Sequence, residues 1–210
     1  MEKPVINYET LIRLTRAIPT LRDPEEIALI TVEGLTHALK VKGCSLFLFN
    51  PMSHELEIAG SFGLSREYLD KGPISAIHSI ASSLSDGQPV AIYDVSDDPR
   101  IQYPEEAVKE GISSMLSVPI IIGERIMGCM RIYTTDPWEF SLEDVNFVQA
   151  MALIVGMALE MSHIKRGYRN SIDILKDMRD PRIFKPKKQR RYESIPGRFP
   201  GHGTPPPMGM

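Results

Sequence analysis

Cysteine is scarce in this 210-residue sequence, which contains only Cys44 and Cys129. Both lie among apolar residues, and neither belongs to a Cys-X-X-Cys pair or to a histidine-rich cluster. These features argue against a disulfide framework and against a structural zinc site. We therefore expect two buried, reduced thiols and no metal centre.

Long apolar runs are also missing. No stretch approaches the ~18 consecutive apolar residues of a membrane span, and residues 1–10 lack the apolar core of a signal peptide. We therefore expect no membrane span and a cytoplasmic location. With 42% hydrophobic and 24% charged residues, the composition is that of a soluble globular protein with one core and terminal extensions.

The sequence has few signs of catalysis. It contains no P-loop, no Gly-X-Ser-X-Gly motif and no paired carboxylates beyond ordinary surface acids. Its densest acidic segment, residues 94–98, lacks the glycine and the final glutamate of a calcium-binding EF-hand loop. We expect a solvated turn there, and a protein that is not an enzyme.

Positive charge is concentrated near the C-terminus. Residues 1–162 contain 12 Lys and Arg against 23 Asp and Glu, a net charge of −11, whereas residues 163–210 contain 12 against 4, a net charge of +8. Residues 181–210 also hold seven prolines and four glycines, so we predict a disordered basic tail. Such a tail can bind nucleic acid, a protein partner or its own acidic domain, and nucleic acid is not the favoured partner.

Apolar periodicity and turn residues predict an alternation of helices and strands. We expect helices at residues 8–18, from 24 to Gly43, at 75–84, at 105–111 and from 142 onward. We expect strands at residues 44–49, 55–62 and 89–95 and in both arms of a hairpin at 113–134. Asp23 and Ser141 are the predicted N-caps, and Gly123-Glu124 is the predicted type II′ hairpin turn. This order of elements predicts an α+β fold with an antiparallel sheet.

Four stretches resemble a GAF domain: ELEIAGSFGLSREYL, YDVSDDPR, EGISSMLSVPIIIGERIMGCMRIYT and LEDVNFVQAMALIVGMALE. They occur in the family's order and extend the resemblance over residues 10–162. The resemblance implies a central antiparallel sheet with the terminal helices on one face. Middle helices and loops cover the other face and, in many relatives, close over a small ligand. We accordingly expect a GAF domain at residues 1–162, a helical extension at 163–180 and the disordered tail at 181–210.

Strand alternation identifies the leading candidate for ligand binding. Met130 and Ile132 should face one side of the last strand, and Cys129, Arg131 and Tyr133 the other. The resemblance implies that this second side faces the ligand, where a guanidinium can anchor an anion or a carbonyl group. The alternative is that Arg131 forms a closed ion pair with an acidic neighbour, such as Asp94, because buried charges are usually paired.

Further candidates share the polar character of a ligand site but have structural alternatives. They are Tyr133, Tyr93, Asp94, Ser114, Ser117 and His78. Asp94 is also suited to capping the turn that follows it, and Ser114 and Ser117 to bonding local backbone. His78 has no second ligand at metal spacing, which favours a surface histidine.

Some GAF domains have specialised activities, and the residues that those activities require do not match this sequence. We cannot assemble the Asn-Lys-Phe-Asp-Glu set of cyclic-nucleotide-binding members, and neither Cys44-Ser45 nor Cys129-Met130 fits the cysteine-histidine pattern common among bilin-binding members. Free methionine sulfoxide reductases of this family use cysteines on mobile loops. Both cysteines here lie in predicted strands, about three or four residues apart along the ladder, which is too far for a disulfide.

Three functions therefore remain, in order of preference. The first is a non-catalytic regulatory module that senses an unidentified small molecule and acts through its terminal helices. The second is a protein-interaction or dimerisation module with a vestigial pocket, and the third, less favoured, is a cysteine-based oxidoreductase. Apolar Ile164, Ile172, Leu175 and Met178 beyond the domain predict a homodimer through the terminal helices, although Gly167 weakens the case for one unbroken helix. No cofactor is assigned.

Overall fold

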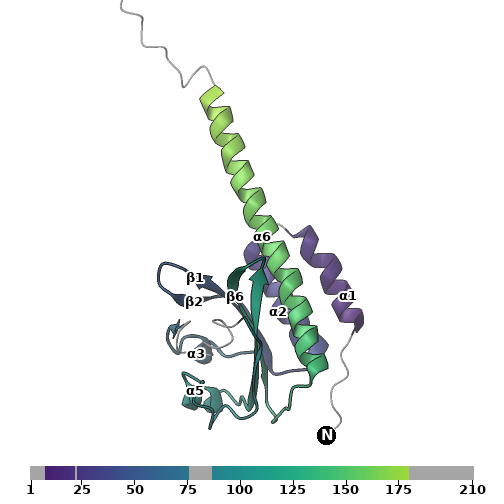
Figure 1. Cartoon of the computed structure of the whole chain (residues 1–210), viewed down its shortest axis with the longest axis vertical. Helices are drawn as coiled ribbons and strands as arrows, with labels where there is room; N and C mark the ends of the chain where they lie inside the picture. The colour runs from purple at the N-terminus through teal and green to yellow at the C-terminus, as the bar shows by residue number, and fades with distance from the viewer. Residues whose placement is uncertain (1–7, 22, 76–86, 180–210) are drawn as a thin grey trace, which may run out of the picture. The chain divides into compact units, whose positions relative to one another are not determined.

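The computed structural model describes residues 8–21, 23–75 and 87–179. In this part of the chain, one antiparallel sheet with the strand order β3-β2-β1-β6-β5-β4 forms the centre of the domain (Figure 1). The strands are β1 (Gly43–Asn50), β2 (Glu55–Phe62), β3 (Ile74–Ser75), β4 (Val90–Ile92), β5 (Ser114–Ile122) and β6 (Arg125–Thr134). The predicted α+β class is confirmed.

The helices in this part of the chain are α1 (Tyr8–Ala17), followed by the 3-10 turn η1 (Ile18–Thr20), α2 (Pro24–Leu39), α3 (Arg66–Leu69), α5 (Pro104–Lys109) and α6 (Leu142–Arg179). Two of them, α2 and α6, begin where the sequence predicts N-caps, whereas the short helix α3 was not predicted. The Asp23 carboxylate accepts a hydrogen bond from the Glu25 backbone N–H at 3.1 Å. The Ser141 hydroxyl accepts one from the Asp144 N–H at 3.3 Å, and Asp144 in turn accepts from the Ser141 N–H.

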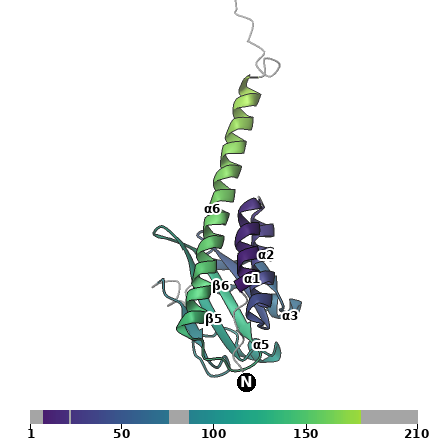
Figure 2. The same cartoon turned by 90° about the vertical axis from the view of Figure 1, so that its right-hand side faces the viewer.

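The two faces of the sheet are covered by different helices. α1, α2 and the first part of α6 lie on one face, and α3 and α5 lie on the other (Figures 1 and 2). Met130 and Ile132 of β6 pack on the first face in a large apolar cluster with side chains of α1, α2 and α6. Cys129 and Tyr133 pack on the second face in two smaller clusters. The arrangement predicted from the resemblance and from strand alternation is therefore confirmed.

Helix α6 is continuous through Gly167 and is long enough and apolar enough to cross a membrane by length and composition, over Leu142–Ile172. Nevertheless, 44% of the apolar 18-residue window within this span is buried inside the protein. Its buried residues, including Val148, Met151 and Val155, pack against the sheet. The buried apolar residues of its first half therefore have partners within the domain, whereas Leu142 and Leu153 are exposed.

The β5–β6 hairpin has the predicted turn. Ile122 pairs with Arg125, which leaves Gly123 and Glu124 as a two-residue loop. Gly123 has a φ of +62°, whereas Glu124 is not among the residues with positive φ, as a type II′ turn requires. A bulge between Ile120 and Ile121 shifts the register of the hairpin close to this end.

Three predicted boundaries are wrong. Helix α2 ends at Leu39, not at Gly43, because Lys40 adopts the left-handed conformation (φ +52°) and Gly43 already pairs in β1. The third strand stops at Ile92, because the following residues form a turn. Ser75 belongs to β3, which was not predicted and which pairs with β2 through Ile74 and Leu56. The rest of the helix predicted at residues 75–84 lies outside the described residues, as does the C-terminal tail.

Candidate functional site

Arg131 lies at the centre of the sheet face that carries α3 and α5. It is 4% exposed, and its guanidinium carbon stands 5.0 Å from the centre of the Phe47 ring. The side chain of Tyr133 lies on the same face of β6, two residues along the strand. The Tyr133 hydroxyl shares a hydrogen bond of 2.8 Å with the hydroxyl of Ser45. Strands β1 and β6 thus hold the guanidinium among aromatic rings and hydroxyl groups.

A cavity of about 140 Å³ opens beside this cluster, between the sheet and the segment that joins α3 to β3. We call it the Lys71 cavity. It is lined by Phe47, Leu56, Ile58, Tyr68, Leu69, Lys71, Gly72, Pro73, Ile74 and Tyr133. The Tyr68 ring meets the Tyr133 ring edge to face, with 6.0 Å between their centres. The Tyr103 hydroxyl donates to the carbonyl of Pro73 at 2.9 Å and so fixes the segment that forms the outer wall.

Lys71 is the charged side chain that the structure places in the lining of this cavity. Its ammonium donates a hydrogen bond to the Tyr68 carbonyl at 2.8 Å and lies 3.6 Å from the centre of the Tyr68 ring. Burial, together with the positive charge of Arg131, lowers the pKa of Lys71 to about 8, although Glu106 and Glu110 oppose this shift. A nearby anion would therefore stabilise the protonated form of Lys71.

The two tyrosines of the cavity stay neutral at ordinary pH. Burial raises the pKa of Tyr133 to about 12, even though Arg131 and the Ser45 hydroxyl favour the ionised form. Burial and the neighbouring Tyr133 also raise the pKa of Tyr68 above its usual range. Both phenols can therefore donate a hydrogen bond, and neither adds negative charge to the cavity.

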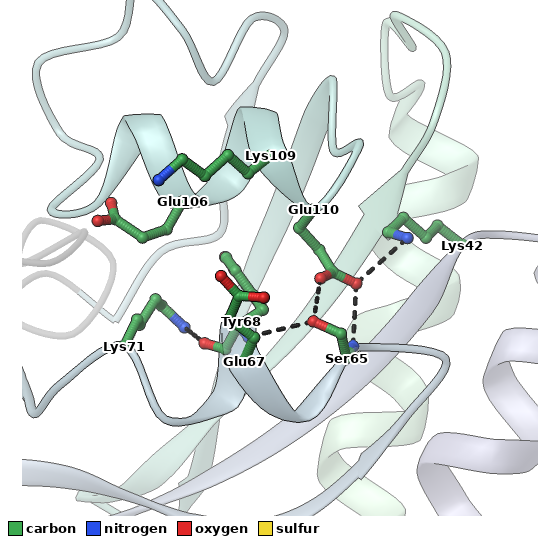
Figure 3. Close-up of a pocket in the computed structure, with 8 residues that line it drawn as sticks. All are labelled: Lys42, Ser65, Glu67, Tyr68, Lys71, Glu106, Lys109 and Glu110. Atoms are coloured by element: carbon green, nitrogen blue, oxygen red, sulfur yellow. Dashed lines mark hydrogen bonds and ion pairs between the residues drawn. The ribbon is translucent and has the colours of Figure 1, made fainter.

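A second, larger cleft of about 590 Å³ lies between α3 and α5 and shares Tyr68 and Lys71 with the Lys71 cavity (Figure 3). Glu110, at the end of α5, accepts hydrogen bonds from both the backbone N–H and the hydroxyl of Ser65, and forms an ion pair with Lys42 at 3.2 Å. Although burial works against it, the hydrogen bonds from Ser65 and Lys42 lower the pKa of Glu110. This network ties the N-cap of α3 to α5 and positions the wall that carries Lys71.

The candidate ligand-binding residues identified from the sequence do not all lie at one site. Tyr133 lines the Lys71 cavity, and Arg131 lies two residues away on the same face of β6. Ser117, whose hydroxyl is buried, pairs with Arg131 across the β5–β6 ladder. His78 lies outside the described residues. Ligand contact by any of them remains a prediction.

Three of the candidates point elsewhere. Tyr93 is 60% exposed. Asp94 is exposed and accepts hydrogen bonds from the Ser96 N–H (2.9 Å) and hydroxyl (2.6 Å), which lower its pKa, so it caps the turn and does not pair with Arg131. Ser114 donates to the Tyr93 carbonyl and accepts from the Trp138 N–H. The hydroxyl of Ser114 therefore serves a structural role. Ser114 also lies an odd number of residues from Ser117, which places the two side chains on opposite faces of β5.

Sequence reasoning missed Lys71, Tyr68 and Phe47. The segment SREYLDKGP has no periodicity that indicates a site, and its one clear signal is Ser65, which caps the short helix α3 by accepting from the Tyr68 N–H at 3.1 Å. Only the packing of α3 on the sheet brings Lys71 towards Arg131. Among the described residues, no group of three or more His, Cys, Asp or Glu side chains is arranged to hold a metal ion.

The two cysteines are buried and unbonded to each other. Cys44 pairs with Ile132 and Cys129 with Phe47, so three positions of the β1–β6 ladder separate the thiols, which also face opposite sides of the sheet. Burial raises the pKa of both thiols. We therefore predict slow alkylation of both cysteines in the native protein, measured by mass spectrometry against a urea-unfolded control. Rapid, stoichiometric labelling of either thiol in the native protein would contradict this and revive the oxidoreductase hypothesis.

Comparisons with known proteins agree with this architecture. The GAF domain family model matches residues 23–159, whereas a search of curated proteins finds no match. The GAF domain of a phosphoenolpyruvate-protein phosphotransferase from Coxiella burnetii superposes with a TM-score of 0.69 and 19% identity, covering 76% of this chain and 96% of that one. Free methionine-R-sulfoxide reductase from Neisseria meningitidis, solved with its substrate, gives a TM-score of 0.67 and 18% identity, covering 79% and 95%. A cyanobacteriochrome GAF domain gives 0.60 and 14%, covering 70% and 95%. At these identities the structural similarity establishes the fold alone.

Proposed function

Because the chain belongs to the GAF domain family, whose members are typically sensory and regulatory signalling modules, we propose that it is a non-catalytic sensor that binds a small molecule in the Lys71 cavity. The observation that supports this most is the combination of the Lys71 ammonium, two neutral phenols and an apolar wall around one cavity, with the buried guanidinium of Arg131 on the same face of β6 as Tyr133. Ligand sites commonly combine a mainly apolar lining with a few polar groups in this way.

The position of the cavity supports a route by which ligand binding would affect the packing of the terminal helices. Tyr133 lines the cavity, and its neighbour Ile132, on the other face of the same strand, packs with α2 and α6. A displacement of β6 by a bound ligand would therefore change the packing of the terminal helices directly. We propose that α6 carries the output.

The non-catalytic assignment rests on the residues of this chain. The solved structures of this fold include a methionine sulfoxide reductase, so the architecture is compatible with catalysis. Here the two thiols are buried on opposite faces of the sheet, and burial raises their pKa, which makes both poor nucleophiles. The polar side chains of the cavity lining are the Tyr68 and Tyr133 hydroxyls and the Lys71 ammonium, which suit binding.

A thermal-shift screen of small metabolites tests the proposal. Leu56 is buried in the wall of the cavity, so Leu56→Trp should fill the space, whereas Leu56→Met keeps its volume nearly unchanged. A ligand at about a hundredfold its Kd should raise the Tm of the wild type and of the methionine variant by at least about 5 °C. The tryptophan variant should show no shift. Equal shifts in both variants, or no stabilising compound, would contradict a ligand site here.

A second function, dimerisation through α6, is favoured by a separate observation. Met157, Met161, Ile164 and Tyr168 are between 47% and 69% exposed and recur at intervals of four, three and four residues. We call these residues the α6 stripe. This spacing is that of the a and d positions of a coiled coil, and Leu175 and Met178 continue the pattern in the sequence.

The charges beside the α6 stripe indicate that its partner is a second copy of the same helix, in parallel. In this register, Glu160 and Lys165 occupy g and e positions, which face each other between the two helices of a parallel pair. Their charges are opposite, so both symmetric contacts would be attractive, and Glu160 would share its carboxylate with Arg125 of its own domain, which lies 2.7 Å away. A homodimer would also let ligand binding in each domain change the pairing of the two α6 helices.

A further inference from the structure

We propose that the ligand class of the Lys71 cavity is a small carboxylate with a short hydrocarbon tail, held by Lys71 with Arg131 behind it. This inference rests on the proposed function, because it assumes that the cavity is a ligand site. It names the charge, the size and the polarity of the ligand.

The charge of the cavity is positive. Among its described lining residues, Lys71 is the charged one, and Arg131, 5.0 Å from the centre of the lining Phe47 ring, is close enough to lower the pKa of Lys71. Burial raises the pKa of both lining tyrosines, so they contribute no negative charge. The carboxylates of Glu106 and Glu110 line the larger cleft, which Lys71 also lines, and their effect on the pKa of Lys71 is smaller than that of burial and Arg131. An anion near Lys71 would gain charge-assisted hydrogen bonds that a neutral ligand cannot make.

The remaining lining restricts what the anion carries. The lining also includes the apolar side chains of Leu56, Ile58, Leu69 and Ile74, of which Leu56 and Ile74 are buried. A volume of about 140 Å³ equals roughly five water-sized groups, at about 30 Å³ each. A carboxylate with a tail of about three carbons fits this space, whereas inorganic phosphate would leave the apolar wall uncovered. The tail would contribute about 25 cal/mol for each Å² of apolar surface removed from water.

Binding should be coupled to the protonation of Lys71. The groups that face its ammonium are Tyr68 on α3, Arg131 on β6, and Glu106 and Glu110 on α5, and their combined effect with burial is a pKa of about 8. A bound carboxylate favours the ammonium form and raises this pKa. Below about pH 7, Lys71 is protonated with or without ligand, so affinity should not change with pH. Above about pH 8, binding takes up a proton, and affinity should fall by up to tenfold per pH unit.

The test is a titration of the full-length protein with butyrate, followed through the ¹H–¹⁵N shifts of Lys71, Gly72 and Tyr133. Butyramide, which has the same shape without the charge, and inorganic phosphate are titrated in parallel. We expect butyrate to bind at least about tenfold more tightly than either compound at about pH 7, and about tenfold more weakly at about pH 9 than at pH 7.

Variants at Lys71 separate charge from shape. Lys71→Met should abolish butyrate binding. Lys71→Arg should retain it within about threefold and remove its pH dependence, because arginine stays protonated throughout this range. Arg66→Met is the matched control, since it removes an exposed cation from the neighbouring helix α3, and it should leave butyrate binding unchanged.

Each contrary result is informative. Equal affinity for butyramide and butyrate, or undiminished binding by Lys71→Met, would overturn the carboxylate inference while leaving the cavity a ligand site. Tighter binding of phosphate than of butyrate would overturn the inference that the ligand carries a hydrocarbon tail. Binding by none of the three probes would overturn the inference too, and the Leu56→Trp screen would then decide separately whether the cavity binds any small molecule.

Discussion

Replacing Ile164 with glutamate is expected to convert a dimer of this protein into a monomer. Ile164 is a central residue of the α6 stripe, so the substitution places two carboxylates, one from each copy, in the apolar contact between the helices. Their repulsion and loss of hydration should weaken association at least about a hundredfold, which is about 2.7 kcal/mol. The measurement is sedimentation equilibrium of the full-length protein at tens of micromolar. This concentration range detects dimers whose free energy of association is about −6 to −7 kcal/mol.

The control for this variant is His163→Glu. His163 is the exposed neighbour of Ile164 and lies outside the α6 stripe, so the same residue introduced there should leave the dimer intact. A monomeric wild type would contradict the dimer itself. A dimer that survives Ile164→Glu would show that the copies meet through another surface.

Replacing Gly128 with alanine is expected to destabilise the fold by about 3–5 kcal/mol, a large part of the 5–15 kcal/mol typical of a domain. Gly128 lies in β6 where this strand crosses close to β1, and a Cβ atom there would stand 1.9 Å from the Phe47 carbonyl oxygen and 2.9 Å from Cα of Leu48. Both atoms belong to the backbone of a central strand. The strands must therefore separate, which would also displace Phe47 from the cavity.

Gly167→Ala provides the matched comparison. Gly167 lies within α6, and a Cβ atom added to it would have no neighbouring atom within 4 Å, so alanine should raise stability by up to about 1 kcal/mol through its better helix propensity. Urea unfolding of both variants, followed by circular dichroism, gives the two free energies. If Gly128→Ala had the same free energy of unfolding as the wild type, β1 and β6 would not be packed as closely as described.

Much of the fold could be predicted from local signals in the sequence. The alternation of residues 55–62 gave the bounds of β2, and Asp23 followed by Pro24 gave the start of α2. The predictions failed where a distant contact decides the local structure. β3 is only two residues long and exists because it pairs with β2, and α2 ends early because the chain must enter β1 beside the Phe62 carbonyl.

The site was predicted only in part for the same reason. Arg131 and Tyr133 were assigned to the correct face because alternation along one strand is a local property. Ser114 was misplaced, although its odd spacing from Ser117 already puts the two on opposite faces of β5. Lys71 was missed because nothing in residues 65–73 indicates that α3 packs on β6, and this packing depends on contacts more than 40 residues apart, such as that of Ser65 with Glu110.

The central claim is that the Lys71 cavity holds a small molecule, and native mass spectrometry tests it most directly. The full-length wild type and Leu56→Trp are each incubated with the small-molecule fraction of the expression host and measured at equal concentration. A ligand of suitable size should appear as an added mass on the wild type and be missing from the tryptophan variant, whose cavity is filled. A wild type that carries no added mass, or an identical added mass on both proteins, would contradict the claim.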